Sequence, residues 1–142
     1  MEFKMSYTEK IIIETKGICD VVNLTPKIEK IVEKSEIKDG LVNIFITGST
    51  AGLTTIEYEE NLLRDFKEMM ERLIPQKKSY YHDQTWGEAN GFSHLRASLI
   101  GPEVTIPLEE GKILLGSWQQ IVLCDFDRHP RTREVIVTII SG

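Results

Sequence analysis

The chain has 142 residues, a hydrophobic fraction of 41% and a formal net charge of −5. These values fit one globular domain over residues 1–142 and exclude a disordered chain, a collagen-like chain and a coiled coil. The acidic excess disfavours nucleic-acid binding, and no apolar run approaches the roughly 18 residues of a membrane span. Because the N-terminus lacks a signal-peptide core, we expect a cytoplasmic protein in which Cys19 and Cys124 are reduced.

The first half of the chain alternates between β-like and helical patterns. Runs of β-branched and apolar residues predict strands over residues 5–14, 41–46 and 50–58. Thr25 followed by Pro26 predicts the start of an amphipathic helix that ends before Gly40. A second apolar helix face runs from Leu62 to Leu73.

Strands dominate the second half. Ser93 is the expected cap of a short helix over residues 94–100. Strands are expected over residues 103–108, 112–115, 118–127 and 134–140, with the last two paired as a hairpin. Together these elements predict an α+β fold with mainly antiparallel, sandwich-like sheets and two or three helices packed on them.

One turn between strands has a composition suited to anions. Gly48, Ser49 and Thr50 combine a glycine with two hydroxyls, and backbone N–H groups in such a turn can bind phosphate. The segment is not a P-loop, because no Gly-Lys-Ser/Thr sequence and no helix follow it. A plain connecting turn is the alternative interpretation.

Two of the three histidines, His82 and His94, flank a loop that contains Trp, Gly and Asn. Two imidazoles could hold a divalent metal ion or act as acid and base, although their spacing matches no standard zinc pattern. His129 is expected at an exposed hairpin tip, and the arginines at 128, 131 and 133 are expected to form a solvated patch.

Three further side chains have both a structural and a functional interpretation. Glu57 lies near a strand end, and Asp65 lies at the edge of an apolar helix face. Either carboxylate could be a solvated surface charge or a cation ligand. Trp118 could lie in the core or stack on an aromatic ligand.

Three motifs in order, GSTAGLTTIEYE, YYHDQTWGEANGFSHLRASLIGPEVTIP and GKILLGSWQQIVLCDFD, resemble the secondary thiamine-phosphate synthase family, the small YjbQ-like proteins. The resemblance covers about residues 8 to 140. It implies a compact α+β fold, a homotrimer with a polar cleft near the subunit junction, a divalent metal ion (Mg²⁺ or Zn²⁺) in some members, and a weak thiamine-phosphate synthase activity. Family motif positions are matched by Glu57, Asp65, His82, Asn90, His94, Trp118 and Gln119.

Many bacterial family members have a histidine where this chain has Gly48, so a three-histidine metal site is not expected here. The resemblance suggests His82, His94, Glu57 and Asp65 as catalytic residues, the two histidines also being candidate metal ligands. Phosphate would be bound by Arg96 and the turn of Gly48, Ser49 and Thr50, and the pyrimidine by Trp118, Gln119 and Asn90. The alternative is a non-catalytic trimer that binds a metal or a small anion.

Overall fold

The computed structural model describes residues 5–142. In this range the strands form two antiparallel sheets, one of five strands in the order β1-β8-β3-β5-β6 and one of three in the order β2-β7-β4. The strands are β1 (Ser6–Thr15), β2 (Asp20–Asn23), β3 (Gly40–Ile46), β4 (Ala51–Ile56), β5 (Glu103–Glu109), β6 (Lys112–Ile113), β7 (Gln120–Asp125) and β8 (Arg131–Ser141). The α+β class and the antiparallel sheets are therefore confirmed.

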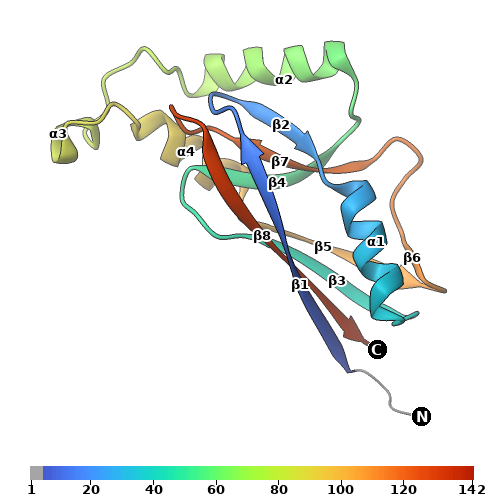
Figure 1. The fold of residues 1–142 in the computed structure, drawn as a ribbon. Coiled ribbons are helices and arrows are strands. Elements are labelled where there is room, and N and C mark those ends of the chain that lie inside the picture. Colours follow the sequence, from blue (N-terminus) through green and yellow to red (C-terminus); the bar gives the residue numbers. More distant parts are fainter. Residues whose placement is uncertain (1–4) are drawn as a thin grey trace.

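Four helices lie within the described range: α1 (Thr25–Ser35), α2 (Glu60–Leu73), α3 (Asp83–Trp86) and α4 (Gly91–Ile100). Helix α2 lies over the three-stranded sheet, while α3 and α4 lie at one end of the molecule and α1 and β6 lie towards the other (Figure 1). Among residues 5–142, no helix combines the length and the apolar character that a membrane crossing requires.

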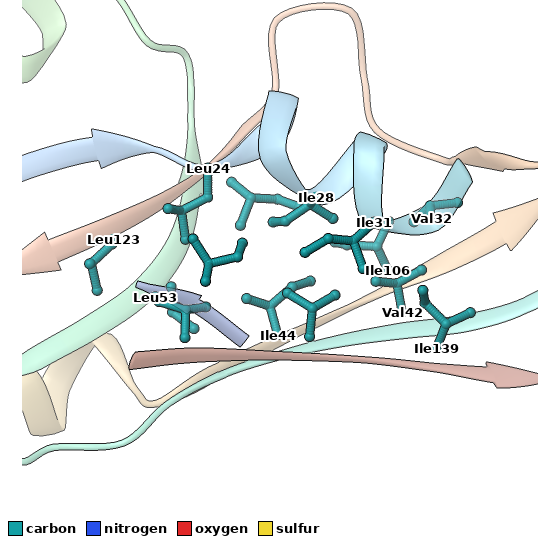
Figure 2. Packing of buried hydrophobic residues seen from close by; sticks show 14 of the residues in the cluster. Leu24, Ile28, Ile31, Val32, Val42, Ile44, Leu53, Ile106, Leu123 and Ile139 are labelled. Atoms are coloured by element: carbon teal, nitrogen blue, oxygen red, sulfur yellow. The ribbon is translucent and has the colours of Figure 1, made fainter. Parts of the chain in front are cut away.

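The main core lies between α1 and the two sheets. Ile28, Ile31 and Val32 sit one helical turn or less apart, so they form one face of α1, and that face packs on Val42 and Ile139 (Figure 2). A second core holds α2 and α4 against the three-stranded sheet; its buried members include Phe66, Met70, Ala97 and Cys124.

The prediction that the last two strands pair as a hairpin is wrong. β7 pairs with β2 and β4, whereas β8 pairs with β1 and β3 in the other sheet. The alternation of apolar residues shows which face of a strand is buried but not which strand lies beside it. Asp125 at the end of β7 and Asp127 in the turn that follows are both buried, and the chain passes from one sheet to the other at this point.

Two helix starts also differ from expectation. Thr25 is inside α1, where its hydroxyl accepts the backbone N–H of Ile121 at 2.8 Å, and Leu24 occupies the cap position. Ser93 is inside α4, which begins after Asn90. Thr25 looks like a cap in the sequence because its partner Ile121 lies in a distant strand, whereas the buried Ser93 hydroxyl has no hydrogen-bond partner among the described residues. The short elements β2 and α3 were not expected from the sequence.

Candidate functional site: two polar clusters at opposite ends of β4

The imidazoles of His82 and His94 lie together. His82 occupies the cap position of α3 and His94 lies in the first turns of α4. Their ring centroids are 4.7 Å apart with an interplanar angle of 68°, and both residues are half-buried. The structure therefore brings together two groups that the sequence separates by a loop.

Asp83 holds the loop between the two histidines in shape. Its carboxylate accepts the backbone N–H groups of Gly91 at 2.9 Å and Tyr80 at 3.1 Å. These hydrogen bonds, that from Gly91 foremost, lower the pKa of Asp83 below its ordinary value. At Gly91 an added Cβ would lie 2.6 Å from the Cβ of Tyr80, so only glycine permits this close approach. Asp83 is not among the candidates that the sequence suggests, where its position directly after His82 is the one available signal.

The turn of Gly48, Ser49 and Thr50 has one buried hydroxyl. Gly48 and Ser49 are exposed, whereas the Thr50 hydroxyl donates to Asp127 at 2.9 Å and accepts from Arg133 at 2.7 Å. An added Cβ at Gly48, whose φ is 138°, would lie 3.0 Å from Nη1 of Arg133. The Thr50 side chain is thus engaged in the protein interior, which leaves the backbone and Ser49 as the ligand-accessible part of the turn.

The sequence predicts a solvated patch of the arginines at 128, 131 and 133. For Arg133 this prediction is wrong, because its side chain is only 8% exposed. Arg133 donates from Nε and Nη2 to the carboxylate of Asp125, at 2.8 Å and 2.9 Å. Asp127 beside it is also buried. Burial by itself would raise the pKa of Asp127, but hydrogen bonds from the backbone of His129 and from Thr50 and Arg131 outweigh it and hold that pKa below its ordinary value.

Arg96 also differs from the expected phosphate ligand. Its side chain is 2% exposed, and its Nε and Nη2 donate to the Ile74 carbonyl at 3.0 Å and 2.8 Å. Nη2 also pairs with Glu71 at 2.8 Å, and the guanidinium lies over the ring of Phe92. Arg96 therefore ties α4 to the end of α2 and presents almost no surface to a ligand.

The second polar cluster lies where β4 ends. Glu57, Tyr58, Glu59 and Trp118 line a surface pocket of about 450 Å³. Gln119 next to it is fixed by two hydrogen bonds, since its Oε1 accepts the N–H of Gly116 and its Nε2 donates to Thr55. β4 has six residues, so Thr50 and Glu57 are separated by about 20 Å. Of the residues expected to bind the pyrimidine, Trp118 and Gln119 therefore lie before β7, away from the end of the molecule that carries α3 and α4, whereas Asn90 lies with the histidines at the start of α4 (Figure 1).

Glu57 and Asp65, the two carboxylates considered as cation ligands, do not line one pocket. Asp65 is exposed on α2 and is absent from the lining of the Glu57 pocket. Asn90 is half-buried at the cap position of α4, where its side chain makes no capping hydrogen bond. Among residues 5–142, no three His, Cys, Asp or Glu side chains gather closely enough to hold a metal ion. The two imidazoles supply at most two ligands from one chain.

Comparison with known proteins identifies the family. Residues 9–142 match the family model described as UPF0047 protein YjbQ-like. This chain belongs to the YjbQ-like family. A UPF0047 protein of Archaeoglobus fulgidus is 39% identical over 128 residues, covering 90% of this chain and 97% of the relative. The UPF0047 protein YugU of Bacillus subtilis is 29% identical over 130 residues, covering 91% and 96%.

Solved structures agree with the fold. A protein of Sulfolobus solfataricus, described as YjbQ-like and of unknown function, has a TM-score of 0.92 and 32% identity over 96% of this chain and 98% of its own. A hypothetical protein of Aeropyrum pernix has a TM-score of 0.88 and 26% identity, covering 96% and 99%. Membership of the YjbQ-like family establishes the fold, and it does not by itself assign a reaction.

Proposed function

We propose that this YjbQ-like protein binds a divalent metal ion of the zinc type through His82 and His94. The observation that carries the proposal is the 4.7 Å separation of the two ring centroids. Imidazole nitrogen is a ligand for zinc and similar transition metals, whereas Mg²⁺ prefers oxygen. Of the two ions that the resemblance suggests, the histidine pair therefore favours Zn²⁺ over Mg²⁺.

The donor set fits such an ion only in part. Two imidazoles leave at least two positions of a tetrahedral ion open, and the described residues offer no third ligand of the usual types beside them. Water, a phosphate oxygen or a side chain of a neighbouring copy would fill these positions. A bound ion would supply a positive charge that accepts an anionic ligand, while Asp83 fixes the loop that holds both rings.

A metal titration tests this assignment. Chelator-treated protein is titrated with Zn²⁺ by isothermal calorimetry, comparing wild type with His82→Ala, His94→Ala and the control His129→Ala. His129 is exposed and pairs with Glu88, so its loss should leave zinc affinity unchanged. Each of the other variants should lose at least about tenfold in affinity, or about 1.4 kcal/mol. Wild-type affinity in both would refute the assignment.

A second candidate function is thiamine-phosphate synthesis. In that reaction the nitrogen of a thiazole phosphate displaces pyrophosphate from hydroxymethylpyrimidine diphosphate. One feature of the structure supports this second candidate. Trp118, Gln119 and Glu57 form a surface cluster with the aromatic and polar groups that a pyrimidine ring would need, although the cluster lies at the end of β4 away from the histidines. A homotrimer in which this cluster faces the histidines of another copy would bring both sets to one cleft.

Pyrophosphate release with both substrates tests the second candidate. The His94→Ala and Trp118→Ala variants, which lie in different clusters, should each lower the rate at least tenfold if the clusters combine across a subunit boundary. Sedimentation of the same samples should give the mass of three chains. A monomer, or release that neither substitution changes, would remove this candidate and leave the zinc proposal to its own titration.

A further inference from the structure

We propose that the pocket at the end of β4 binds an organic cation, specifically the methylated ammonium group of a small molecule. The pocket lies between the segment after β4 and the segment before β7 and has a volume of about 450 Å³. That volume falls in the range of small-molecule sites. Its lining consists of two aromatic rings, two carboxylates, two amides and one hydroxyl, supplied by Asn23, Glu57, Tyr58, Glu59, Ser117, Trp118 and Gln120.

The two aromatic side chains are held on the surface. Trp118 is 75% exposed and Tyr58 is 44% exposed. The Tyr58 hydroxyl donates to the carbonyl of Val21 at 3.0 Å, which fixes the position of its ring. The negative face of an indole or phenol ring attracts a cation, and Trp gives the strongest such contact. A fixed ring beside an open indole is therefore suited to a cation.

The charge of the pocket selects the same class of ligand. Glu57 and Glu59 give the lining a formal charge of −2, and neither lysine nor arginine contributes to it. The Glu59 carboxylate accepts the backbone N–H of Asn61 and so stays at the start of α2. Glu57 is exposed and makes no ion pair within residues 5–142. A phosphate would be repelled here, whereas a cation would neutralise the charge.

The rest of the lining distinguishes an organic cation from a metal ion. Asn23 donates to Gln120 at 3.3 Å, so these two amides are already paired with each other. The charged oxygens of the lining are those of Glu57 and Glu59, and the Glu59 carboxylate is already engaged with the backbone N–H of Asn61. A methylated ammonium group is large, apolar at its surface and weakly hydrated. It therefore loses less hydration on meeting aromatic rings than a metal ion or a primary amine would.

Single-tryptophan fluorescence tests the proposal directly. Trp86 is 80% exposed in α3, so Trp86→Phe leaves Trp118 as the one tryptophan of the chain. This protein is titrated with choline and with 3,3-dimethylbutan-1-ol, the neutral compound of the same shape. Choline should change the Trp118 emission saturably and bind about tenfold more tightly than the neutral compound. Added salt should weaken choline binding, because the carboxylates are at the surface.

Two variants and one matched control complete the experiment. Glu57→Gln should weaken choline binding several-fold, whereas Glu109→Gln, an exposed glutamate at the end of β5, should not change it. Trp118→Leu should abolish saturation transfer from the protein to the choline methyl groups in NMR. Equal binding of choline and the neutral compound, an absence of saturable binding, or equal affinity in Glu57→Gln and Glu109→Gln would overturn the proposal. Because the histidine pair is untouched, this outcome does not depend on zinc binding.

Discussion

Breaking the buried pair of Asp125 and Arg133 should cost more stability than any surface ion pair of this chain. Asp125 is fully buried and accepts two hydrogen bonds from Arg133, one from the Thr15 hydroxyl at 2.5 Å and one from the backbone N–H of Asp127 at 2.9 Å. In Asp125→Ala the guanidinium stays buried, and its nearest remaining carboxylate is that of Asp127, 3.8 Å away. Removing one partner of a buried pair costs about 3–5 kcal/mol.

The assay is thermal unfolding at fixed protein concentration, supported by urea unfolding. For a chain of 142 residues, 1 kcal/mol corresponds to about 3 °C, so the unfolding midpoint of Asp125→Ala should fall by about 9–15 °C. The double variant Asp125→Ala/Arg133→Met should lose less than the sum of the two single variants, because no unpaired charge remains buried.

A surface pair supplies the control. Lys10 and Glu134 lie 3.8 Å apart, with side chains that are 58% and 48% exposed. Glu134→Ala should therefore cost less than about 1 kcal/mol. If Asp125→Ala cost no more than Glu134→Ala, or if the losses of Asp125→Ala and Arg133→Met simply added, the inference of a tightly coupled buried pair would be refuted.

Three further predictions concern backbone strain, pH and thiol reactivity. Gly40→Ala should lower the free energy of unfolding in urea by at least about 2 kcal/mol, because the added Cβ would lie 1.9 Å from a carbonyl oxygen of β8. Gly87→Ala is the control: its Cβ would meet nothing within 4 Å, so it should lower the free energy of unfolding by only about 1 kcal/mol, for the positive φ at that position. Because folding lowers the pKa of Asp127, the ionised carboxylate should contribute its full stability above about pH 5 and lose it as the pH falls through the folded-state pKa. Asp127→Asn should therefore make the free energy of unfolding depend less on pH in the acid range. An equal pH dependence in this variant and in wild type would contradict the prediction. Burial raises the pKa of Cys19 to about 11 and that of Cys124 to about 12, so both thiols should resist alkylation at pH 8 until the chain unfolds; fast labelling of native protein would refute this.

The chemistry of the candidate residues could be predicted, but their grouping could not. His82 and His94 are conspicuous in the sequence because histidines are few, and the structure places their rings in contact. Arg96 and Arg133 are also conspicuous, yet both are buried and paired inside the protein. A sequence shows that an arginine is present, whereas its burial depends on carboxylates and carbonyls contributed by distant segments.

Local patterns of this sequence were sufficient to predict most strands, the two long helices and the α+β class. Those patterns show which face of each element is apolar, and the apolar face of an element is the face that becomes buried. Only the tertiary structure decided that β7 and β8 join different sheets and that Glu57 and Trp118 lie at the end of β4 away from the histidines. Strand partners and the meeting of distant side chains depend on contacts across the whole chain, which no local periodicity encodes.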